Sequence, residues 1–123
     1  MSVLDTILVV DDDEINRKVA GLFLQHMGWK TDQAVSAFEA LEQLQQNEYY
    51  CVLLDISMPG MSGIELCRHL RGNPRWHDLR LIAYTAHAMS DEQEVMLQAG
   101  FDAIVTKPLT RDSLIAALAA PTD

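Results

Sequence analysis

A regular alternation of short apolar runs with longer segments of helical period constrains this chain most. The apolar runs cover residues 7–10, 51–54, 81–84 and 103–105, and polar residues, glycine or proline follow each of them. Uninterrupted runs of this length are typical of strands that are buried on both faces of a sheet. A further segment, 30–34, is β-compatible but half polar, so we expect it to form an exposed edge strand.

The segments between these strands have apolar residues at helical spacing. The expected core-facing residues are Ile15, Val19, Leu22, Phe23 and Met27 before Gly28; Phe38, Leu41 and Leu44 after Ser36; Ile64, Cys67 and Leu70 before Gly72; Val95, Met96 and Leu97 between Ser90 and Gly100; and Leu114, Ile115 and Leu118 after Thr110. Strand and helix thus alternate five times. This order predicts a doubly wound α/β sandwich, in which helices cover both faces of a five-stranded parallel sheet.

The composition fits one globular domain spanning residues 1–123. The apolar fraction is 49% and the charged fraction 22%, values that allow a buried core and argue against a disordered chain. The formal net charge of −9 argues against direct binding to nucleic acid or to an anionic membrane, because both need clustered cations. The apolar runs are too short to span a bilayer, and no signal-peptide pattern precedes them, so we expect a cytoplasmic protein.

Several residue types that often carry chemistry fit packing roles here. Cys51 and Cys67 lie in different core elements without metal-ligand spacing, and we expect both to be buried thiols. Trp76 lies in a polar loop and is expected to anchor it. Since the histidines show no paired ligand spacing, we assign no metal role to His26, His69, His77 or His87.

The chemically informative residues follow the strands. Asp11 and Asp12 come after the first strand, Asp55 after the third, Thr85 after the fourth and Lys107 after the fifth. In open α/β sheets, functional groups gather beyond the carboxyl ends of the strands, near the point where the strand order reverses. We therefore expect carboxylates, a hydroxyl and an ammonium group to converge at one edge of the sheet.

The acidic residues of this group divide into two kinds. Asp13 and Glu14 open the first helix, where the helix dipole favours acids. Asp11 and Asp12, placed beside Asp55, would instead form a cluster of like charges that a cation offsets. Hard carboxylate oxygens with room for water suit Mg²⁺, or Mn²⁺, better than a soft metal. A metal ion, a carboxylate, a hydroxyl and an ammonium group together favour phosphoryl transfer to an aspartate.

The chain resembles the receiver domains of bacterial two-component response regulators over essentially its whole length. The matching motifs are ILVVDDDEINR near the start, LLDISMPGMSG in the middle, YTAHAM after the fourth strand and TKP near the end. The spacing of Asp55, Thr85 and Lys107 also matches that family. The resemblance implies a flavodoxin-like fold with strand order 2-1-3-4-5.

For the phosphoryl group, the resemblance implies that Asp55 is the phosphoacceptor, that Lys107 pairs with one phosphoryl oxygen and that Thr85 donates its hydroxyl to another. The donor is a phosphohistidine on a histidine kinase or a histidine phosphotransfer protein. The charge added at Asp55 switches a surface that a downstream protein partner reads. Such a domain is not a conventional enzyme, because it takes part only in its own phosphorylation and dephosphorylation.

For the metal ion, the resemblance implies a site beside Asp55. Asp12 binds Mg²⁺ directly, Asp11 binds it directly or through water, and Ser57 contributes its backbone carbonyl. We expect a weak site for one divalent cation.

The resemblance also implies a cis Lys107–Pro108 bond, which would aim the lysine into the site. The family commonly has a switching aromatic residue three positions before the lysine, and this chain has Ile104 there. A β-branched residue has few rotamers. We therefore expect the segment after Thr85 and the fourth helix to carry the response, with Ile104 serving as packing.

Two alternative functions remain open at this stage. Residues 11–13 contain the D-x-D spacing of haloacid-dehalogenase-like phosphatases, which also form an aspartyl phosphate, although those enzymes usually need a larger core. The other alternative is a receiver-shaped interaction module that works without phosphorylation. The sequence also leaves open whether the chain is a single-domain regulator or part of a longer protein such as a hybrid kinase.

Overall fold

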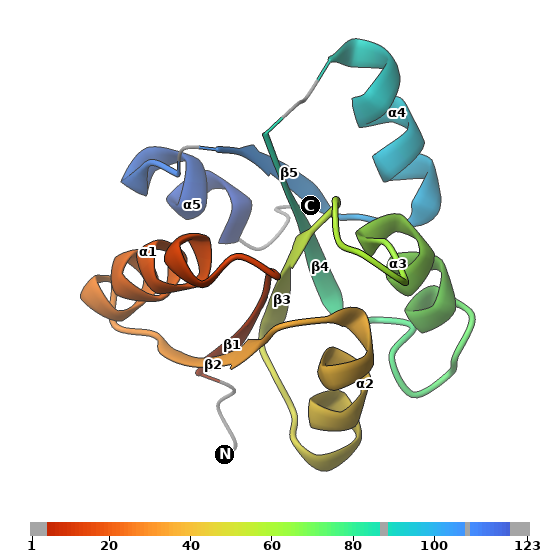
Figure 1. The fold of residues 1–123 in the computed structure, drawn as a ribbon, viewed down its shortest axis with the longest axis horizontal. Helices are drawn as coiled ribbons and strands as arrows, with labels where there is room; N and C mark the ends of the chain where they lie inside the picture. The colour runs from red at the N-terminus through yellow and green to blue at the C-terminus, as the bar shows by residue number, and fades with distance from the viewer. Residues whose placement is uncertain (1–4, 87–88, 108, 119–123) are drawn as a thin grey trace.

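Five strands form one parallel sheet in the order β2-β1-β3-β4-β5 (Figure 1). The computed structural model describes residues 5–86, 89–107 and 109–118. The strands are β1 (Thr6–Val10), β2 (Lys30–Ala34), β3 (Cys51–Asp55), β4 (Arg80–Thr85) and β5 (Ala103–Thr106). The predicted doubly wound sheet, its strand order and the edge position of β2 are confirmed.

Helices alternate with the strands and cover both faces of the sheet. They are α1 (Glu14–His26), α2 (Ala37–Gln46), α3 (Gly63–Arg71), α4 (Ser90–Ala99) and α5 (Arg111–Leu118). Figure 1 shows α1 and α5 on one side of the sheet and α2, α3 and α4 on the other. None of the described helices has the length and apolar character that crossing a membrane requires.

Side-chain caps determine where several helices begin. Ser36 Oγ accepts a hydrogen bond from the Glu39 backbone N–H (3.1 Å), and Thr110 Oγ1 accepts one from the Ser113 N–H (3.0 Å). Such caps satisfy amide groups that have no partner inside the helix. α4 begins at Ser90 as predicted, and Met89, the residue at its N-cap, makes no side-chain capping bond.

The sheet separates two apolar layers. On the α1 and α5 face, alternate strand residues such as Ile7, Leu53 and Ile82 are buried, and the intervening residues face α2, α3 and α4. Cys51 lies in the first layer and Cys67 in the second, and both are buried free thiols as predicted. Period-two alternation along each strand is therefore what assigns a residue to one face of the molecule.

The predicted core-facing stripe of α1 is wrong in part. Ile15, Val19 and Leu22 are exposed, while Ala20 and Leu24 are buried and Phe23 and Met27 are half-buried. The helix lies close to the sheet at its small residues: a Cβ atom added at Gly21 would lie 3.5 Å from the Gln33 side chain in β2. Because the small residues face the sheet, the bulkier stripe turns outward.

The same correction applies to four other apolar residues assigned to core-facing stripes. α2 buries Ala37 and Ala40, α4 buries Met96 and Ala99, and α5 buries Leu114, Ala117 and Leu118. Small residues again occupy much of the contact with the sheet. The residues that are exposed instead are Phe38, Val95, Leu97 and Ile115.

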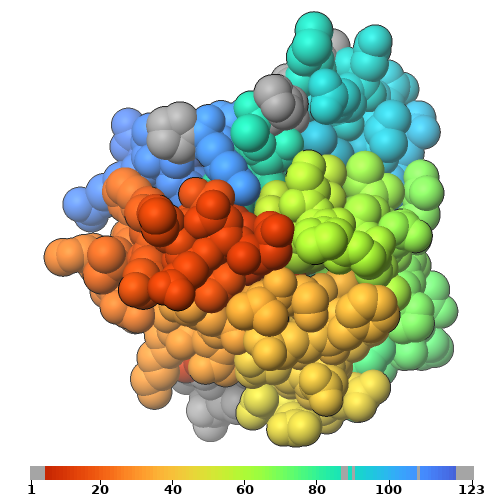
Figure 2. All heavy atoms as spheres, viewed as in Figure 1, coloured from red at the N-terminus to blue at the C-terminus, as the bar shows by residue number. Residues whose placement is uncertain are grey.

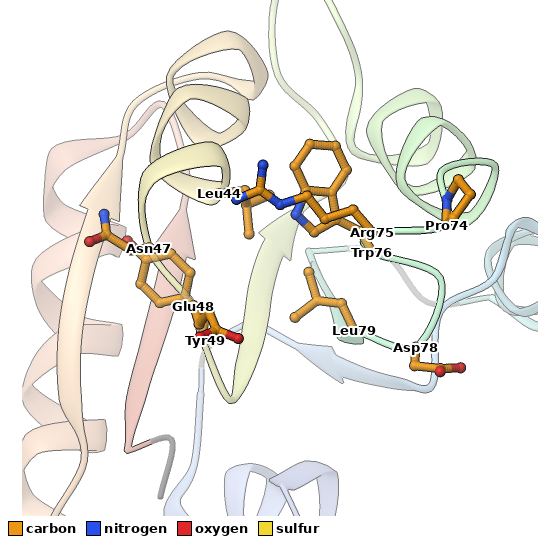
Figure 3. A pocket seen from close by; sticks show the side chains of 9 residues that line it. All are labelled: Leu44, Asn47, Glu48, Tyr49, Pro74, Arg75, Trp76, Asp78 and Leu79. Atoms are coloured by element: carbon orange, nitrogen blue, oxygen red, sulfur yellow. The ribbon is translucent and has the colours of Figure 1, made fainter. Parts of the chain in front are cut away.

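Trp76 anchors the loop between α3 and β4, as predicted. It is 8% exposed, and the Arg75 guanidinium lies 5.3 Å from its ring centroid while donating to the Gln45 carbonyl at 2.7 Å. Figure 3 shows these side chains around a shallow pocket of about 200 Å³, whose lining includes Leu44 and Tyr49. The pocket lies at the amino ends of the strands, opposite the predicted functional edge.

Arg71 connects the loop after α3 to the turn between α4 and β5. Its Nε donates to the Gly100 carbonyl (2.9 Å) and its Nη2 pairs with Asp102 Oδ2 (2.9 Å). Its Nη1 donates to the carbonyls of His77 (3.1 Å) and Leu79. One half-buried guanidinium thus satisfies several backbone acceptors and one carboxylate.

The turn that Arg71 contacts has little room for change. Gly100 has φ +120°, and a Cβ atom there would lie 2.6 Å from Arg71 Cγ. Asp102 Oδ2 also accepts from the Leu81 N–H (2.8 Å), and the Asp102 N–H donates to the Leu81 carbonyl (2.8 Å). These bonds set the point at which β5 begins beside β4.

We predict that Arg71→Ala lowers the free energy of unfolding by about 2–4 kcal/mol, because it leaves partly buried carbonyls without this donor and Asp102 without its paired cation. The matched control is Arg68→Ala, which removes an exposed arginine from the same helix and should cost about 0.5 kcal/mol or less. Urea unfolding followed by circular dichroism measures both. Equal unfolding midpoints for the two variants would contradict the prediction.

Candidate functional site

The predicted site residues lie where β1, β3, β4 and β5 end. Asp55 is the last residue of β3 and pairs in register with Tyr84 of β4, and Asp11 directly follows β1, whose Val10 pairs with Leu54. In Figure 2, the start of α1 (red), α2 (amber) and the yellow-green segment after β3 meet at the centre of the face in view. The parallel sheet therefore brings together residues that are far apart in the sequence.

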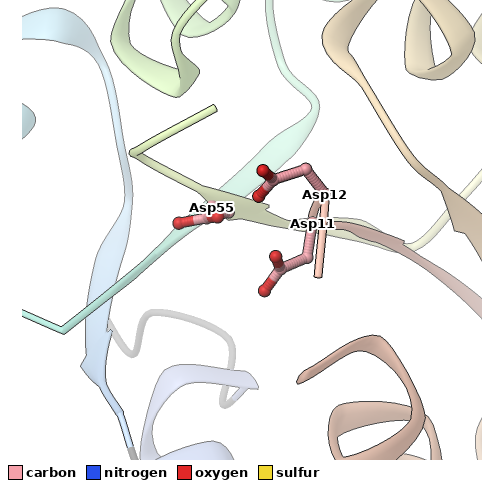
Figure 4. A group of neighbouring side chains, drawn as sticks. All are labelled: Asp11, Asp12 and Asp55. Carbon is pink, nitrogen blue, oxygen red and sulfur yellow. The ribbon is translucent and has the colours of Figure 1, made fainter. Parts of the chain in front are cut away.

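Three carboxylates form the centre of the site. One oxygen from each of Asp11, Asp12 and Asp55 lies within 4.8 Å of the other two. Figure 4 shows these side chains reaching from two adjacent strand ends toward a common space. Asp11 and Asp55 are buried, and Asp12 is exposed, so the group is open to solvent on one side only.

The segment after β1 is held by hydrogen bonds that orient Asp11. Asp11 Oδ1 accepts from the Asp13 N–H (2.8 Å), and Arg17 Nη1 donates to the Asp11 carbonyl (2.8 Å). Asp13 Oδ1 accepts from the N–H groups of Ile15 (2.8 Å) and Asn16 (3.1 Å), so Asp13 caps α1 as its predicted helix-terminal role requires. Asp11 therefore contributes to the site, while Asp13 caps the helix.

Lys107 supplies positive charge to the carboxylates. Its Nζ lies 3.3 Å from Asp11 Oδ2 and 3.5 Å from Asp55 Oδ1, and the side chain is 19% exposed. The Lys107 backbone N–H donates to the Thr85 carbonyl (2.8 Å), which ties these two strand ends together. One ammonium group facing three carboxylates leaves an excess of negative charge in the site.

The surroundings of Asp55 shift the pKa of its carboxyl group. Its Oδ1 accepts from the Ser57 N–H (3.2 Å). Burial, and next the neighbouring Asp11 carboxylate, raise the pKa of Asp55 to about 6, while Lys107 and the Ser57 N–H act in the opposite direction. The metal-free site therefore holds a carboxylate whose charged form is disfavoured.

The loop after β3 is shaped by a close approach at Gly63. A Cβ atom at Gly63 would lie 2.3 Å from the Asp55 carbonyl oxygen, so any side chain there would displace the backbone that carries Asp55. Ser62 and Glu65 form a capping box, with bonds of 3.2 and 3.0 Å, that starts α3 at this point. Part of the MPGMSG motif therefore serves to seat α3 against the end of β3.

The other predicted residues differ in burial and in their distance from the carboxylates' end of the sheet. Thr85 is buried at the end of β4 beside the carboxylates' strands, and Ser57 is exposed, with its N–H on Asp55. Ile104 is half-buried and packs against the layer under α4, which fits its predicted packing role. The predicted cis bond involves Pro108, which lies outside the described residues, as does His87.

Sequence reasoning missed one residue of the site, Tyr84. Its ring is 2% exposed, and Lys107 Nζ lies 4.5 Å from the ring centroid. Burial, followed by the charges of Asp11, Asp55 and Asp13, raises the pKa of Tyr84 to about 12, so the phenol is neutral at physiological pH. Tyr84 and Asp55 share a face because they pair in register, and the alternation of side chains along each strand does not reveal this until that register is known.

A family model for the response regulator receiver domain matches residues 7–119. The chain belongs to this family. Among curated relatives, the polar-differentiation response regulator DivK of Brucella ovis is 30% identical over 105 residues, which are 85% of each chain. This similarity spans both proteins almost fully.

Segments of two longer signalling proteins are similar too. The aerobic respiration control sensor protein ArcB of Escherichia coli is 40% identical over 111 residues, and the signal transduction histidine-protein kinase BarA of the same organism is 34% identical over 109. Both alignments cover 89% of this chain. The chain spans 14% of the length of ArcB and 12% of that of BarA.

Solved structures agree with the fold. The chemotaxis protein CheY4 of Vibrio cholerae superposes with a TM-score of 0.86 at 22% identity, covering 94% of this chain and 97% of that one. The receiver domain of the sensor histidine kinase PA1611 of Pseudomonas aeruginosa has a TM-score of 0.84 at 27% identity, with coverage of 94% and 95%. That domain was solved with a magnesium ion coordinated in its active site cleft.

We predict that Asp55→Asn stabilises the metal-free protein in a pH-dependent way. The pKa of Asp55 is raised, so the folded state binds more protons than the unfolded state between about pH 4 and pH 6, and Asp55 costs stability as the pH rises through that window. The gain from Asp55→Asn should be small at pH 4 and reach about 1–3 kcal/mol at pH 7.

Urea unfolding in the presence of EDTA at the two pH values measures this effect. Glu48→Gln is the control, since it removes an exposed carboxylate from the opposite edge of the sheet. The prediction would be contradicted by a stability gain of Asp55→Asn that is equal at both pH values or that matches the gain of Glu48→Gln. Either result would show that ionised Asp55 does not destabilise the folded state.

Proposed function

We propose that this receiver accepts a phosphoryl group on Asp55 from a phosphohistidine, in a reaction that requires Mg²⁺. The observation that carries the proposal is the convergence of Asp11, Asp12 and Asp55 with the Lys107 ammonium group 3.5 Å from Asp55. A nucleophilic carboxylate, oxygen ligands for a cation and a fixed positive charge are the groups that phosphoryl transfer to an aspartate needs. Family membership favours this function over the phosphatase alternative.

The residues present fit a hard divalent cation. Asp11 Oδ2 is buried and accepts no hydrogen bond from the described residues, although Lys107 Nζ lies 3.3 Å away. A buried carboxylate oxygen without a hydrogen bond is costly, and a cation would offset that cost. Asp11, Asp12, Asp55 and the Ser57 carbonyl would hold Mg²⁺, or Mn²⁺, with water completing the shell. When bound, the cation supplies charge that neutralises phosphoryl oxygens.

The chain's own residues then divide the work of transfer. An Asp55 Oδ atom attacks phosphorus in line with the donor nitrogen: the new P–O bond forms as the P–N bond breaks, and the imidazole nitrogen keeps the electron pair of the broken bond. Negative charge is spread over the equatorial oxygens in the transition state. Lys107 offsets it on one side of Asp55, and Thr85 donates its hydroxyl to another oxygen.

The phosphoryl donor follows from the same proposal. A phosphohistidine on a histidine kinase or a histidine phosphotransfer protein matches the kinase-linked relatives, and we take residues 1–123 as one receiver unit. The product adds negative charge beside Thr85 at the end of β4. That charge would change the conformation of the segment that follows Thr85 and leads into α4. A downstream protein would then bind the exposed surface of α4 differently.

We predict that a phosphohistidine donor labels the wild-type protein with ³²P in the presence of Mg²⁺ and fails to label Asp55→Asn. Asn has no nucleophilic carboxylate oxygen, so labelling should fall to background. Asp13→Asn is the matched control: it removes a neighbouring carboxylate but keeps a side chain that caps α1, so it should be labelled like the wild type.

The label should be acid-stable and base-labile, as an acyl phosphate is, and mass spectrometry of the borohydride-reduced protein should locate it at residue 55. Asp55→Asn that retains wild-type label would exclude Asp55 as the acceptor. A wild-type protein that takes no label from several donors would favour the phosphorylation-independent interaction module instead.

We predict that Mg²⁺ raises the thermal unfolding midpoint of the wild-type protein and that Asp12→Ala removes most of this response. A Mg²⁺ concentration about tenfold above Kd contributes about 1.4 kcal/mol, or roughly 5 °C for a domain of this size. Glu48→Ala deletes another exposed carboxylate, away from the site, and should respond like the wild type. A full Mg²⁺ response in Asp12→Ala would place the cation elsewhere.

A further inference from the structure

Tyr84 is an aromatic residue inside the proposed phosphorylation site. It is the penultimate residue of β4, paired with Asp55 on one side and with Val105 on the other. Its side chain lies in the layer between the sheet and helices α1 and α5. Asp55 and Asp11 lie on the same face of the sheet. At 2% exposure, the Tyr84 side chain is almost fully enclosed by its neighbours.

The ring of Tyr84 is a third partner of the Lys107 ammonium group. Lys107 Nζ lies 4.5 Å from the ring centroid, 3.3 Å from Asp11 Oδ2 and 3.5 Å from Asp55 Oδ1. A cation within about 6 Å of an aromatic face is attracted by the ring quadrupole, and more strongly where water is excluded. Both carboxylate distances are long for charge-assisted hydrogen bonds, which are typically about 2.7–2.9 Å. The ring therefore contributes to where the ammonium group rests.

We propose that Tyr84 is a positioning residue for the phosphoryl transfer: its ring face holds the Lys107 ammonium group between Asp11 and Asp55, where the phosphoryl oxygens arrive. This inference rests on the proposed function, because it assigns Tyr84 a role in that same reaction. Tyr84 itself transfers no proton and forms no bond to phosphorus.

The ring contact differs from the two carboxylate contacts in one respect. Asp55 becomes an acyl phosphate when it takes the phosphoryl group, so that Lys107 exchanges a carboxylate oxygen for a phosphoryl oxygen. The charge of Asp11 would be shared with a cation when one is bound. The anionic partners of Lys107 thus change as the reaction proceeds, while the quadrupole of a neutral, buried ring stays the same. Tyr84 keeps the ammonium group in place while its other partners change.

The first test compares variants of Tyr84 in their rate of phosphorylation by a small-molecule donor, phosphoramidate, with Mg²⁺. Tyr84→Leu keeps an apolar side chain without a ring and should react roughly tenfold more slowly, while Tyr84→Phe keeps the ring face and should stay within about twofold of the wild type. Tyr50→Leu is the control, because it removes a second tyrosine, itself partly buried, from the same layer, where its ring packs beside Trp29. It should react at the wild-type rate.

The second test is spectroscopic and needs no reaction. Protons above an aromatic face are shifted upfield by the ring current, so the Lys107 ε-methylene resonances in the metal-free wild type and in Tyr84→Phe should lie upfield of those in Tyr84→Leu. Tyr50→Leu should retain the upfield shift. If Tyr84→Leu does not fold, Tyr84→Met provides a flexible side chain without a ring for both measurements.

The results separate this inference from the proposed function. Equal rates for Tyr84→Leu and the wild type, or a Tyr84→Phe rate as low as that of Tyr84→Leu, would overturn the positioning role. So would Lys107 resonances that are the same with and without the ring. A wild-type protein that takes no label at residue 55 would instead overturn the phosphoacceptor assignment, whatever the Lys107 resonances show.

Discussion

The interaction on which this site depends is the contact of one lysine with two buried carboxylates. Asp11 and Asp55 lie at the ends of adjacent strands, and burying two like charges is expensive without a nearby cation. Lys107 enters from β5, which is separated from β3 by β4, so its side chain must pass the end of β4 to reach them. The residue that it passes there is Tyr84. Strand order, ion pairing and the aromatic contact are therefore parts of one arrangement.

The sequence was most informative about the backbone. Short runs such as 51–54 identify the strands. Because parallel strands end at one edge of the sheet, the sequence alone predicts that Asp11, Asp55 and Lys107 converge, as they do. Capping residues such as Ser36 also carried reliable information, since their hydrogen bonds involve only neighbours in the chain. Features that depend on local chemistry or on strand polarity alone are thus recoverable from sequence.

Features that depend on how closely two elements approach were not recoverable. An apolar pattern does not reveal which side of α1 faces the sheet, and the contact is made through Ala20 and Gly21 while Ile15 and Leu22 face solvent. The Tyr84 contact escaped prediction because an apolar strand residue has no visible partner until the lysine from β5 is placed above it. Packing distances, rather than hydrophobicity, decide both cases.

The turn between α4 and β5 has a consequence for how such a chain can vary. Gly100 and Asp102, held by Arg71, define where β5 starts, and the Lys107 N–H then reaches the Thr85 carbonyl in register. Side chains alternate along a strand, so inserting or deleting one residue in β5 after this turn would swing Lys107 to the opposite face of the sheet. The number of residues between this turn and Lys107 is therefore constrained as firmly as the sequence of the turn, even though the turn itself touches no reacting atom.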